Sequence, residues 1–140
     1  MKVRFKKLVP GASAPKQGTP GSAGFDLTAT SVSIDRQWGK ITYGCGLAVE
    51  IPPGHVGLLF PRSSIHKLRL VLSNAVGLID SDYRGEIKAV FYGAHTGMTY
   101  KRGERFAQLV IMPIPEIEYE EAQELSETSR GTGGYGSTGR

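Results

Sequence analysis

Apolar and polar residues alternate along several short stretches of the chain, and this period of two is typical of β-strands with one buried face. The alternating apolar positions are Val3 and Phe5; Leu47, Val49 and Ile51; and Leu68, Leu70 and Leu72. Denser apolar runs at 56–60, 89–92 and 106–112 predict strands that are covered on both faces. No stretch holds a helical period, although 63–67 could form a single helical turn.

Turn signals separate these stretches, because Gly, Pro and Asp supply the backbone geometry that tight turns need. The turns are expected at 52–54, 82–85, 93–97 and 101–104. Residues 116–128 mix strand and acidic linker character and predict neither. Many short strands in a chain of 140 residues predict one all-β domain, either a sandwich, a jelly roll or a barrel.

The net charge of +4 is unevenly distributed. Residues 116–129 contain six Glu and no Lys, Arg or Asp, so the rest of the chain carries +10. A surface of this charge suits a polyanion such as a nucleotide triphosphate or a nucleic acid. Scattered lysines on a soluble protein would give the same total, so charge alone does not decide.

The lone Cys45 excludes a disulfide within the chain and is interpreted as a small core residue rather than a reactive thiol. No stretch resembles a secretion signal, and no apolar run approaches the roughly 18 residues of a membrane span. A cytoplasmic or other intracellular reducing compartment is therefore expected, without a membrane partner.

The last eleven residues, 130–140, contain five Gly and no Pro. Such a segment buries too little apolar surface to order itself and should be mobile without a ligand. Its Gly, Ser, Thr and Arg residues are those that bind phosphate, although a solubilising tail or a nucleic-acid arm would have a similar composition. Two units are predicted, a β domain at 1–129 and a mobile tail at 130–140.

Several polar residues stand where predicted strands meet turns. Asp80, with Tyr83 after it, could serve as a general base, or the pair could simply belong to a hairpin turn. The other positions of this kind are Asp26, Arg62, Ser63, Ser64, Arg105 and Gln108. Each of these taken singly is compatible with a structural role.

Other chemistry finds little support in the sequence. The residues His55, His66 and His95 lack the spacing of a zinc site and are expected on the surface. Trp38 is expected at a hairpin tip or in packing. No nucleophile elbow is present.

Five stretches taken together, in this order, resemble the five motifs of the trimeric dUTPase family. They are 23–30, 61–67, 74–92, 101–111 and 130–139. The resemblance implies a β jelly roll that assembles as a homotrimer with active sites at subunit interfaces. It also implies hydrolysis of dUTP to dUMP and pyrophosphate by attack of water on the α-phosphorus, which keeps uracil out of DNA and supplies dUMP for thymidylate synthesis.

The resemblance also implies a role for each motif residue. Asp80 resembles the carboxylate that activates water, and Tyr83 the ring that excludes a 2′-hydroxyl. Asn74 and Gly77 resemble the edge that reads uracil. The residues that resemble phosphate contacts are Arg62, Ser63, Ser64 and Gln108. Asp26 resembles the acid that holds water on Mg²⁺ carried by the triphosphate.

In the tail, Arg130 resembles the γ-phosphate arginine and Tyr135 the ring that stacks on uracil. The remaining predicted tail contacts are Gly136, Ser137 and Thr138. The family usually has Phe where Tyr135 stands, and a Leu/Met-Ala pair where Ile65 and His66 stand. The family pattern suggests that the tail serves a neighbouring subunit.

Three alternatives remain open from the sequence. A dCTP deaminase shares the fold but needs a different acid–base set. A binder of single-stranded nucleic acid would need a groove of stacking aromatics, and stable binding of nucleic acid is not expected here. A jelly roll without activity would not need the catalytic-motif residues.

Overall fold

The computed structural model describes residues 1–137, apart from the side chain of Thr96, and its regular secondary structure is almost entirely β-strand. The strands are β1 (Arg4–Lys7), β2 (Lys16–Gln17), β3 (Phe25–Thr28), β4 (Ser31–Asp35), β5 (Lys40–Gly44), β6 (Leu47–Glu50), β7 (His55–Pro61), β8 (Val71–Leu72), β9 (Gly77–Ile79), β10 (Lys88–Tyr92) and β11 (Arg105–Pro113). Two short helical segments, α1 (Ile65–Leu68) and η1 (Ala94–Thr96), connect some of them.

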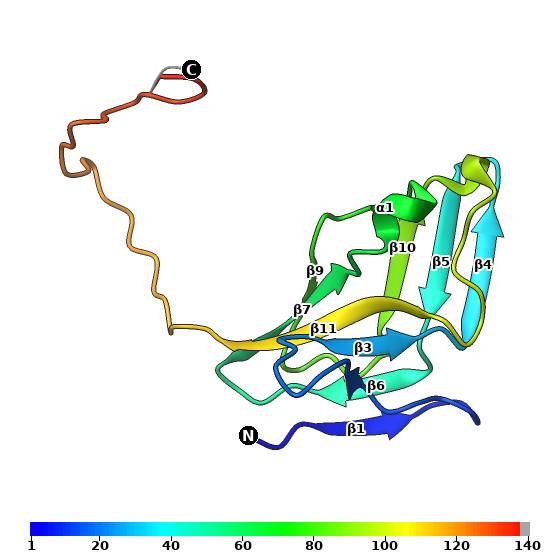
Figure 1. Cartoon of the computed structure of the whole chain (residues 1–140). Helices are drawn as coiled ribbons and strands as arrows, with labels where there is room; N and C mark the ends of the chain where they lie inside the picture. The colour runs from blue at the N-terminus through cyan, green and yellow to red at the C-terminus, as the bar shows by residue number, and fades with distance from the viewer. Residues whose placement is uncertain (138–140) are drawn as a thin grey trace.

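The strands form one five-stranded, one four-stranded and one two-stranded sheet, and every pairing is antiparallel (Figure 1). The five-stranded sheet has the order β2-β3-β11-β7-β9, and the four-stranded sheet has the order β4-β5-β10-β8. Strands β1 and β6 pair with each other and form the two-stranded sheet. This arrangement of sheets is the predicted all-β jelly roll.

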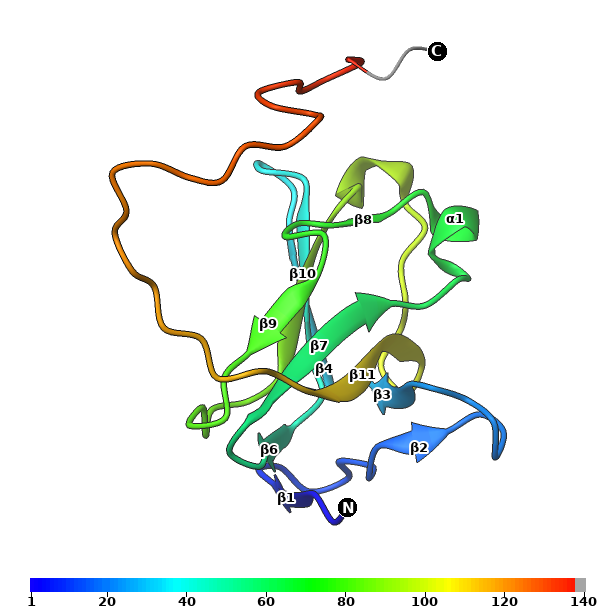
Figure 2. The same cartoon turned by 90° about the vertical axis from the view of Figure 1, so that its left-hand side faces the viewer.

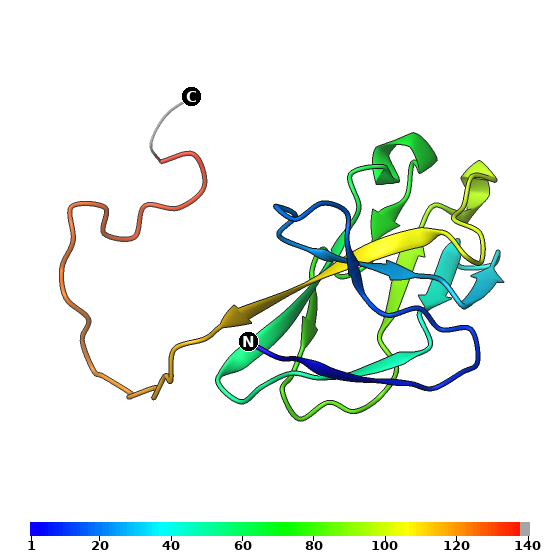
Figure 3. The same cartoon turned by 60° about the horizontal axis from the view of Figure 1, so that its bottom comes forward.

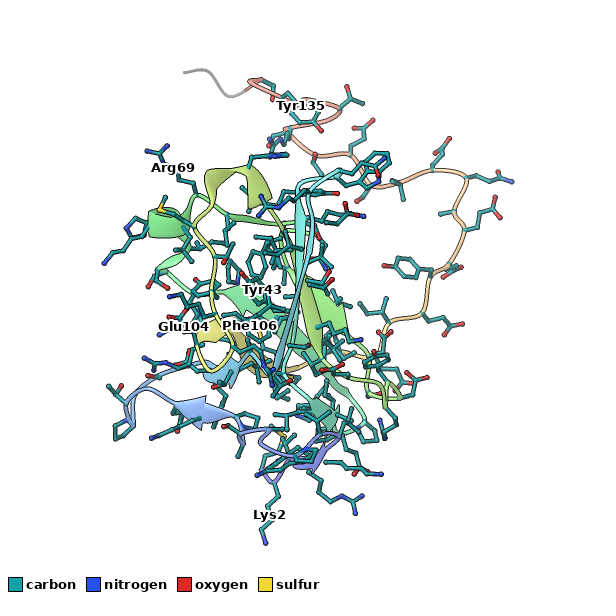
Figure 4. The ribbon with its side chains drawn as sticks, turned by 90° about the vertical axis from the view of Figure 1, so that its right-hand side faces the viewer. Lys2, Tyr43, Arg69, Glu104, Phe106 and Tyr135 are labelled. Atoms are coloured by element: carbon teal, nitrogen blue, oxygen red, sulfur yellow. The ribbon has the colours of Figure 1, made fainter. Side chains whose placement is uncertain are left out.

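The core lies between the two larger sheets and is rich in aromatic residues. Tyr43 of β5 is fully buried and stacks on Phe106 of β11, with the ring centroids 5.3 Å apart (Figure 4). Tyr43 also meets Phe91 of β10 edge-on at 5.6 Å. Aromatic pairs with these geometries add to the stabilisation that comes from area burial, so the rings lock the sheets together.

The dense apolar runs locate strands β7, β10 and β11 correctly, but β10 is not covered on both faces in the single chain, because its exposed ends Lys88 and Tyr92 alternate with buried Ala89 and Phe91. Alternation also locates β1 and β6, and the predicted helical turn appears as α1. The hairpin of β4 and β5 is not among the predicted strands, although Val32, Ile34, Ile41 and Tyr43 alternate on both sides of its turn. Trp38 lies at the tip of this hairpin and is 66 % exposed, as expected.

Two predictions of strands with one buried face are wrong. The stretch from Leu68 to Leu72 is not one strand, because α1 ends at Leu68 and Arg69 adopts a left-handed backbone with a φ of 52°. Leu70 and Leu72 are nevertheless both buried. In β6 the neighbouring residues Ala48 and Val49 are both buried, so this strand is covered on both faces.

Strand β1 differs from the prediction in the opposite sense, because all four of its residues are exposed in the single chain. Phe5 is 43 % exposed. The apolar face that the alternation predicts is therefore only partly covered within the described part of the chain, where Val3 packs against the core and Phe5 stays exposed.

Residues 114–137 leave the body at the end of β11 and form neither strand nor helix, and all three ribbon views place this segment away from the sheets (Figures 1, 2 and 3). Every residue of it is exposed except Gly133, which is half-buried. Gly131 and Gly136 have φ values of 52° and 78°, which glycine adopts without the steric penalty of a side chain. Local turns are thus the only backbone order in the described part of the tail.

Cys45 is fully buried, as expected for a core residue, and its thiol donates to the carbonyl oxygen of Ile87 at 3.2 Å. Burial raises the pKa of this thiol to about 11, so the unreactive neutral form persists at physiological pH. Within residues 1–137, no helix is long and apolar enough to cross a bilayer.

Candidate active site

One pocket, of about 250 Å³, gathers four of the residues singled out from the sequence. Asn74, Gly77, Asp80 and Tyr83 all line it, together with residues of β7, β9 and the start of β10. Strand β9 is only three residues long and pairs with β7, so it holds Gly77 rigidly against Leu59. The turn that follows β9 then carries Asp80 and Tyr83 to the mouth of the pocket.

The carboxylate of Asp80 is exposed, and no ion pair or hydrogen bond to it occurs among residues 1–137. The backbone carbonyl of the same residue accepts from the amide of Tyr83 at 3.2 Å, which fixes the turn. A carboxylate held by a rigid turn and open to water has both properties of a general base.

The ring of Tyr83 lies against the backbone of its own turn. Its hydroxyl donates to the carbonyl oxygen of Glu86 at 3.1 Å. Gly85 makes this position possible, because a Cβ atom there would overlap the Tyr83 hydroxyl. Ring and turn therefore form one unit, which leaves the other ring face available to a ligand.

At the opposite wall of the pocket, the backbone comes close to β7. A Cβ atom at Gly77 would lie 3.0 Å from the Cβ of Leu59 and 3.7 Å from the amide nitrogen of Asn74. The side-chain amide of Asn74 is not hydrogen-bonded within the described part of the chain. This amide is free to pair with the edge of a planar ring.

Two lining residues were not predicted from the sequence. The Nζ of Lys88 lies 3.2 Å from the Oε2 of Glu86, and the Oε1 of Glu86 accepts from the amide of Gly46 at 2.8 Å. The spacing of these two residues could have predicted this, since residues two apart in an extended chain, such as 86 and 88, point to the same side. The ammonium group of Lys88 therefore lies at the pocket, and Glu86 links it to the backbone at Gly46.

A second cluster gathers the residues predicted to contact phosphate. Asp26 of β3 is 9 % exposed, and its two carboxylate oxygens accept from Arg62 Nε and Arg105 Nη1, each at 2.9 Å. Charge-assisted bonds of this kind are short and directional. Two guanidinium groups are thus held by one acid, which leaves a net positive charge of one at the ends of β7 and β11.

Gln108 and the two serines lie in this same region. Gln108 of β11 pairs with Asp26 of β3, and its side-chain amide donates to the carbonyl oxygen of Pro61 at 3.2 Å. Gly24 allows this, because a Cβ there would come within 2.9 Å of the Gln108 side-chain oxygen. Ser63 and Ser64 follow Arg62 directly and precede α1.

The register of β7 and β9 places the two clusters at opposite ends of one ladder. Gly57 of β7 pairs with Ile79 of β9, so Asp80, the residue after Ile79, lies opposite Val56 near the start of β7. Arg62 follows the last residue of β7, at the other end of that strand. Six residues of strand separate these positions, which corresponds to about 20 Å at the usual rise per residue. Within one chain, therefore, Asp80 and Arg62 do not meet.

The described tail residues, 130–137, form no hydrogen bond or ion pair with either cluster. The ring of Tyr135 is fully exposed, and Figure 4 places it away from Tyr43 and Phe106 in the body. The Nε of Arg130 donates to the carbonyl oxygen of Gly133 at 3.0 Å, within the tail itself. Gly136 and Ser137 are also exposed, and Thr138 lies outside the described residues.

The histidines do not form a metal site. His55 begins β7, His66 lies in α1 and His95 lies in η1. Within residues 1–137, no three side chains of His, Cys, Asp or Glu come together in a way that could hold a metal ion. The structure therefore offers a metal no cage made only of protein in this part of the chain.

Comparison with known proteins accounts for this arrangement. The family model described as dUTPase matches residues 11–139. The chain belongs to the dUTPase family. The chain is similar to curated deoxyuridine 5′-triphosphate nucleotidohydrolases, with 42 % identity to that of Nautilia profundicola, covering 100 % of both chains. The enzyme of Rhodococcus erythropolis is 39 % identical, covering 99 % of this chain and 87 % of the relative.

Solved dUTPase structures share the fold. The dUTPase of Staphylococcus bacteriophage 80alpha with bound dUpNHpp superposes with a TM-score of 0.85 at 27 % identity, covering 99 % of each chain. The two clusters described above are the parts of this dUTPase fold that carry the first four sequence motifs.

The unusual Ile65 and His66 after the second motif leave the expected turn in place. They begin α1, and the imidazole Nδ1 of His66 lies 2.6 Å from the carbonyl oxygen of Ser63. That contact closes the loop around the serines. The departure from the usual sequence is thus accommodated by a short helix.

Proposed function

We propose that this chain is a dUTP pyrophosphatase, which hydrolyses dUTP to dUMP and pyrophosphate by attack of water on the α-phosphorus. The observation that supports it best is the pocket of about 250 Å³ that Asn74, Gly77, Asp80 and Tyr83 line together. The pocket combines a side-chain amide, a backbone segment without a side chain and an aromatic ring, which recognition of a deoxyuridine would need, with a carboxylate that could activate a water. Such an activity keeps uracil out of DNA and supplies dUMP.

In the proposed reaction, Asp80 accepts a proton from water as the water oxygen bonds to the α-phosphorus. The bond from this phosphorus to the bridging oxygen breaks, and pyrophosphate leaves. Negative charge gathers on the leaving group, where the guanidinium groups of Arg62 and Arg130 and the side chains of Ser63, Ser64 and Gln108 stabilise it. The catalytic power of the protein is therefore largely positional and electrostatic.

Mg²⁺ suits this site as a companion of the triphosphate. Each Asp26 oxygen accepts one arginine bond, and a carboxylate oxygen has a second lone pair that can accept from a metal-bound water. Mg²⁺ keeps several waters, so contact through water fits the chemistry of the ion. When bound, Mg²⁺ would neutralise charge on the phosphate oxygens, while Asp26 orients the two arginines.

Replacing Asp26 with Asn should weaken nucleotide binding both with and without Mg²⁺. In Asp26 each carboxylate oxygen accepts from a different arginine, whereas an amide would present its NH2 group to one of them, so one of the two guanidinium groups loses its bond and its orientation. We expect the affinity for α,β-imido-dUTP to fall about tenfold in EDTA, and further when Mg²⁺ is present. Calorimetric titration in both buffers measures this.

Asp35→Asn is the matched control, because it makes the same change at the end of β4, outside both clusters, and the Asn oxygen can still accept from the amide of Trp38. It should leave both affinities within about twofold of the wild type. An Asp26→Asn chain that binds normally in EDTA would show that the acid does not act through the arginines.

Discrimination against ribonucleotides is assigned to Tyr83. Its ring is fixed by the bond to Glu86 and by contact with Gly85, so it cannot move aside for a 2′-hydroxyl. Tyr83→Ala should raise kcat/KM for UTP relative to dUTP by at least about tenfold. Tyr83→Phe keeps the ring and should preserve the discrimination. Equal ratios for wild type and Tyr83→Ala would exclude the ring as the sugar gate.

We further propose a homotrimer with active sites shared between subunits. The phosphates of one nucleotide are adjacent, so Asp80 and Arg62 of one chain, about 20 Å apart along β7, cannot serve the same molecule. A site that needs both must take them from different subunits. The family resemblance supplies the number three.

An exposed apolar hollow supports assembly of this kind. It has a volume of about 350 Å³ and is lined by residues that include Val3, Phe5, Phe25 and Ile111. Ile114 and Ile117, which follow β11 in the chain, are also exposed. Exposed apolar surface that is contiguous is a mark of association, and cover from a neighbouring subunit would bury the uncovered face of β1.

The tail is proposed to close over a neighbour's site once the triphosphate is bound. Arg130, Ser137 and Thr138 would contact phosphates, with the backbone of Gly136, and Tyr135 would stack on uracil. Residues 1–129 then form the catalytic domain and 130–140 the lid. A reducing intracellular compartment suits the protein, because the free thiol of Cys45 persists there.

Pyrophosphate release from each dNTP and from UTP, with and without Mg²⁺, tests this function. We expect release from dUTP, strongly favoured by Mg²⁺, and little from the other nucleotides. Ammonia should be assayed in the same reactions. Ammonia from dCTP together with no pyrophosphate from dUTP would show a deaminase instead.

A further inference from the structure

The hydroxyl of Tyr100 lies 3.1 Å from the Oγ of Ser64, a residue assigned above to phosphate binding. Tyr100 comes from the loop between η1 and β11 and is 6 % exposed, so it is a core residue. Its hydroxyl is the point at which the core touches the phosphate loop of Arg62, Ser63 and Ser64.

The aromatic core holds Tyr100 in place. Its backbone amide donates to the hydroxyl of Tyr43 at 3.0 Å, and its ring meets those of Tyr43 at 5.8 Å and Phe91 at 6.5 Å, both edge-on. Burial raises the pKa of Tyr43 to about 12, so the phenol stays neutral and continues to accept this bond. The position of the Tyr100 hydroxyl is therefore set by the rigid interior and not by the surface loop.

Ser64 does not use its hydroxyl for the helix that it begins. It occupies the N-cap position of α1, where a serine usually bonds to an amide of the first turn, yet no side-chain cap is made here. Its backbone is already helical, with φ of −65° and ψ of −10°. The hydroxyl is directed at Tyr100 instead, so its role lies outside helix capping.

We infer that Tyr100 is a positioning residue that orients the Ser64 hydroxyl toward the substrate phosphates. A serine hydroxyl has one hydrogen to donate, and phosphate oxygens only accept. When Ser64 donates to phosphate it must accept from Tyr100, and the fixed phenol O–H provides that bond. Such a chain also polarises the Ser64 hydroxyl and strengthens its bond to the anion. The inference rests on the phosphate role of Ser64 in the proposed function.

A double-mutant cycle on the full chain tests this. The affinity for α,β-imido-dUTP with Mg²⁺ is measured for wild type, Tyr100→Phe, Ser64→Ala and the double variant. We expect Tyr100→Phe to weaken binding about five- to tenfold in the wild-type background and less than twofold in the Ser64→Ala background. A purely structural role would give the same loss in both backgrounds. In a Ser63→Ala background the loss should persist in full.

Tyr92→Phe is the control for removal of a tyrosine hydroxyl, since Tyr92 is 48 % exposed and lies on the strand next to Tyr43. It should bind normally. Thermal unfolding of each variant checks the fold. If Tyr100→Phe unfolds, Tyr100→Met fills the space without a hydroxyl and should give the same pattern.

The results distinguish failure of the inference from failure of the proposed function. Normal binding by Tyr100→Phe, or equal losses in both Ser64 backgrounds, would overturn the inference while leaving the proposed function standing. A wild-type chain that fails to bind the dUTP analogue would instead refute the proposed function, and the phosphate role of Ser64 with it.

Discussion

Replacing Asp80 with Asn should lower kcat for dUTP by roughly two to four decades while the affinity for α,β-imido-dUTP changes by less than about threefold. The amide has the shape of the acid but cannot accept a proton from the attacking water. Binding should survive because the Asp80 carboxylate has no protein partner within residues 1–137 that its loss would leave unpaired. Single-turnover rates and calorimetric titration separate the two effects.

Asp82→Asn is the closest control, since it makes the same change two residues further along the same exposed turn. It should keep kcat within about twofold of the wild type. A full rate from Asp80→Asn would remove this residue from the base role, and equal losses from both variants would indicate a general effect of charge on the turn.

The Asp80→Asn variant can also be used to test whether active sites are shared between subunits. Asp80→Asn and Arg62→Ala subunits should each be nearly inactive alone. Mixed by reversible unfolding, they should regain part of the activity, because some sites would combine an intact Asp80 from one subunit with an intact Arg62 from another. Mixtures that remain as inactive as their components would mean that each subunit builds its site alone.

Deleting residues 130–140 should lower kcat/KM for dUTP by about two to three decades and leave the fold intact. The deletion removes a guanidinium from the leaving pyrophosphate and the ring that covers the base, and it admits water to the site. Stability should not change, because the described tail residues 130–137 are exposed, save half-buried Gly133, and bond only to one another and to Thr128. Steady-state kinetics, thermal unfolding and particle mass measure the three expectations.

Point variants separate the contributions within the tail. Arg130→Ala should reproduce most of the rate loss, and Tyr135→Ala a smaller part. Tyr135→Phe should be nearly neutral, since stacking depends on the ring. A truncated chain with full activity would exclude a lid, and a truncated chain with a lowered unfolding temperature would mean that the tail packs on the body.

Much of the fold could be predicted from hydrophobic patterning. The apolar runs at β7 and β11 are strands in which neighbouring residues are both buried, because a strand covered on both faces gathers apolar residues without alternation. The run at β10 also forms a strand, although its burial alternates in the single chain. The β4–β5 hairpin carried the same kind of signal in a weaker form, since its polar positions Ser31, Ser33 and Thr42 leave only two apolar positions on each strand. The stretch ending at Leu72 was misassigned because burial at alternate positions does not require a continuous strand.

The candidate site could be predicted only as a set of residues. Nothing in the sequence shows that Asp26 holds both Arg62 and Arg105, or that Glu86 and Lys88 line the same pocket as Asp80. Tyr100 carries no motif, and its contact with Ser64 arises from a loop that meets the phosphate loop 36 residues away. These pairings depend on how β3, β7 and β11 lie side by side.

The class of the fold, the residues that bear chemistry and the family membership can all be predicted from the chain alone, because local patterns and motif order are properties of the chain. Which of those residues come together depends on the three-dimensional arrangement of the strands. The register of β7 against β9 separates Asp80 from Arg62 by about 20 Å, and register follows from pairing between strands distant in sequence. The tertiary structure also shows that the apolar face of β1 is only partly buried within the described residues, since Val3 packs against the core whereas Phe5 is 43 % exposed.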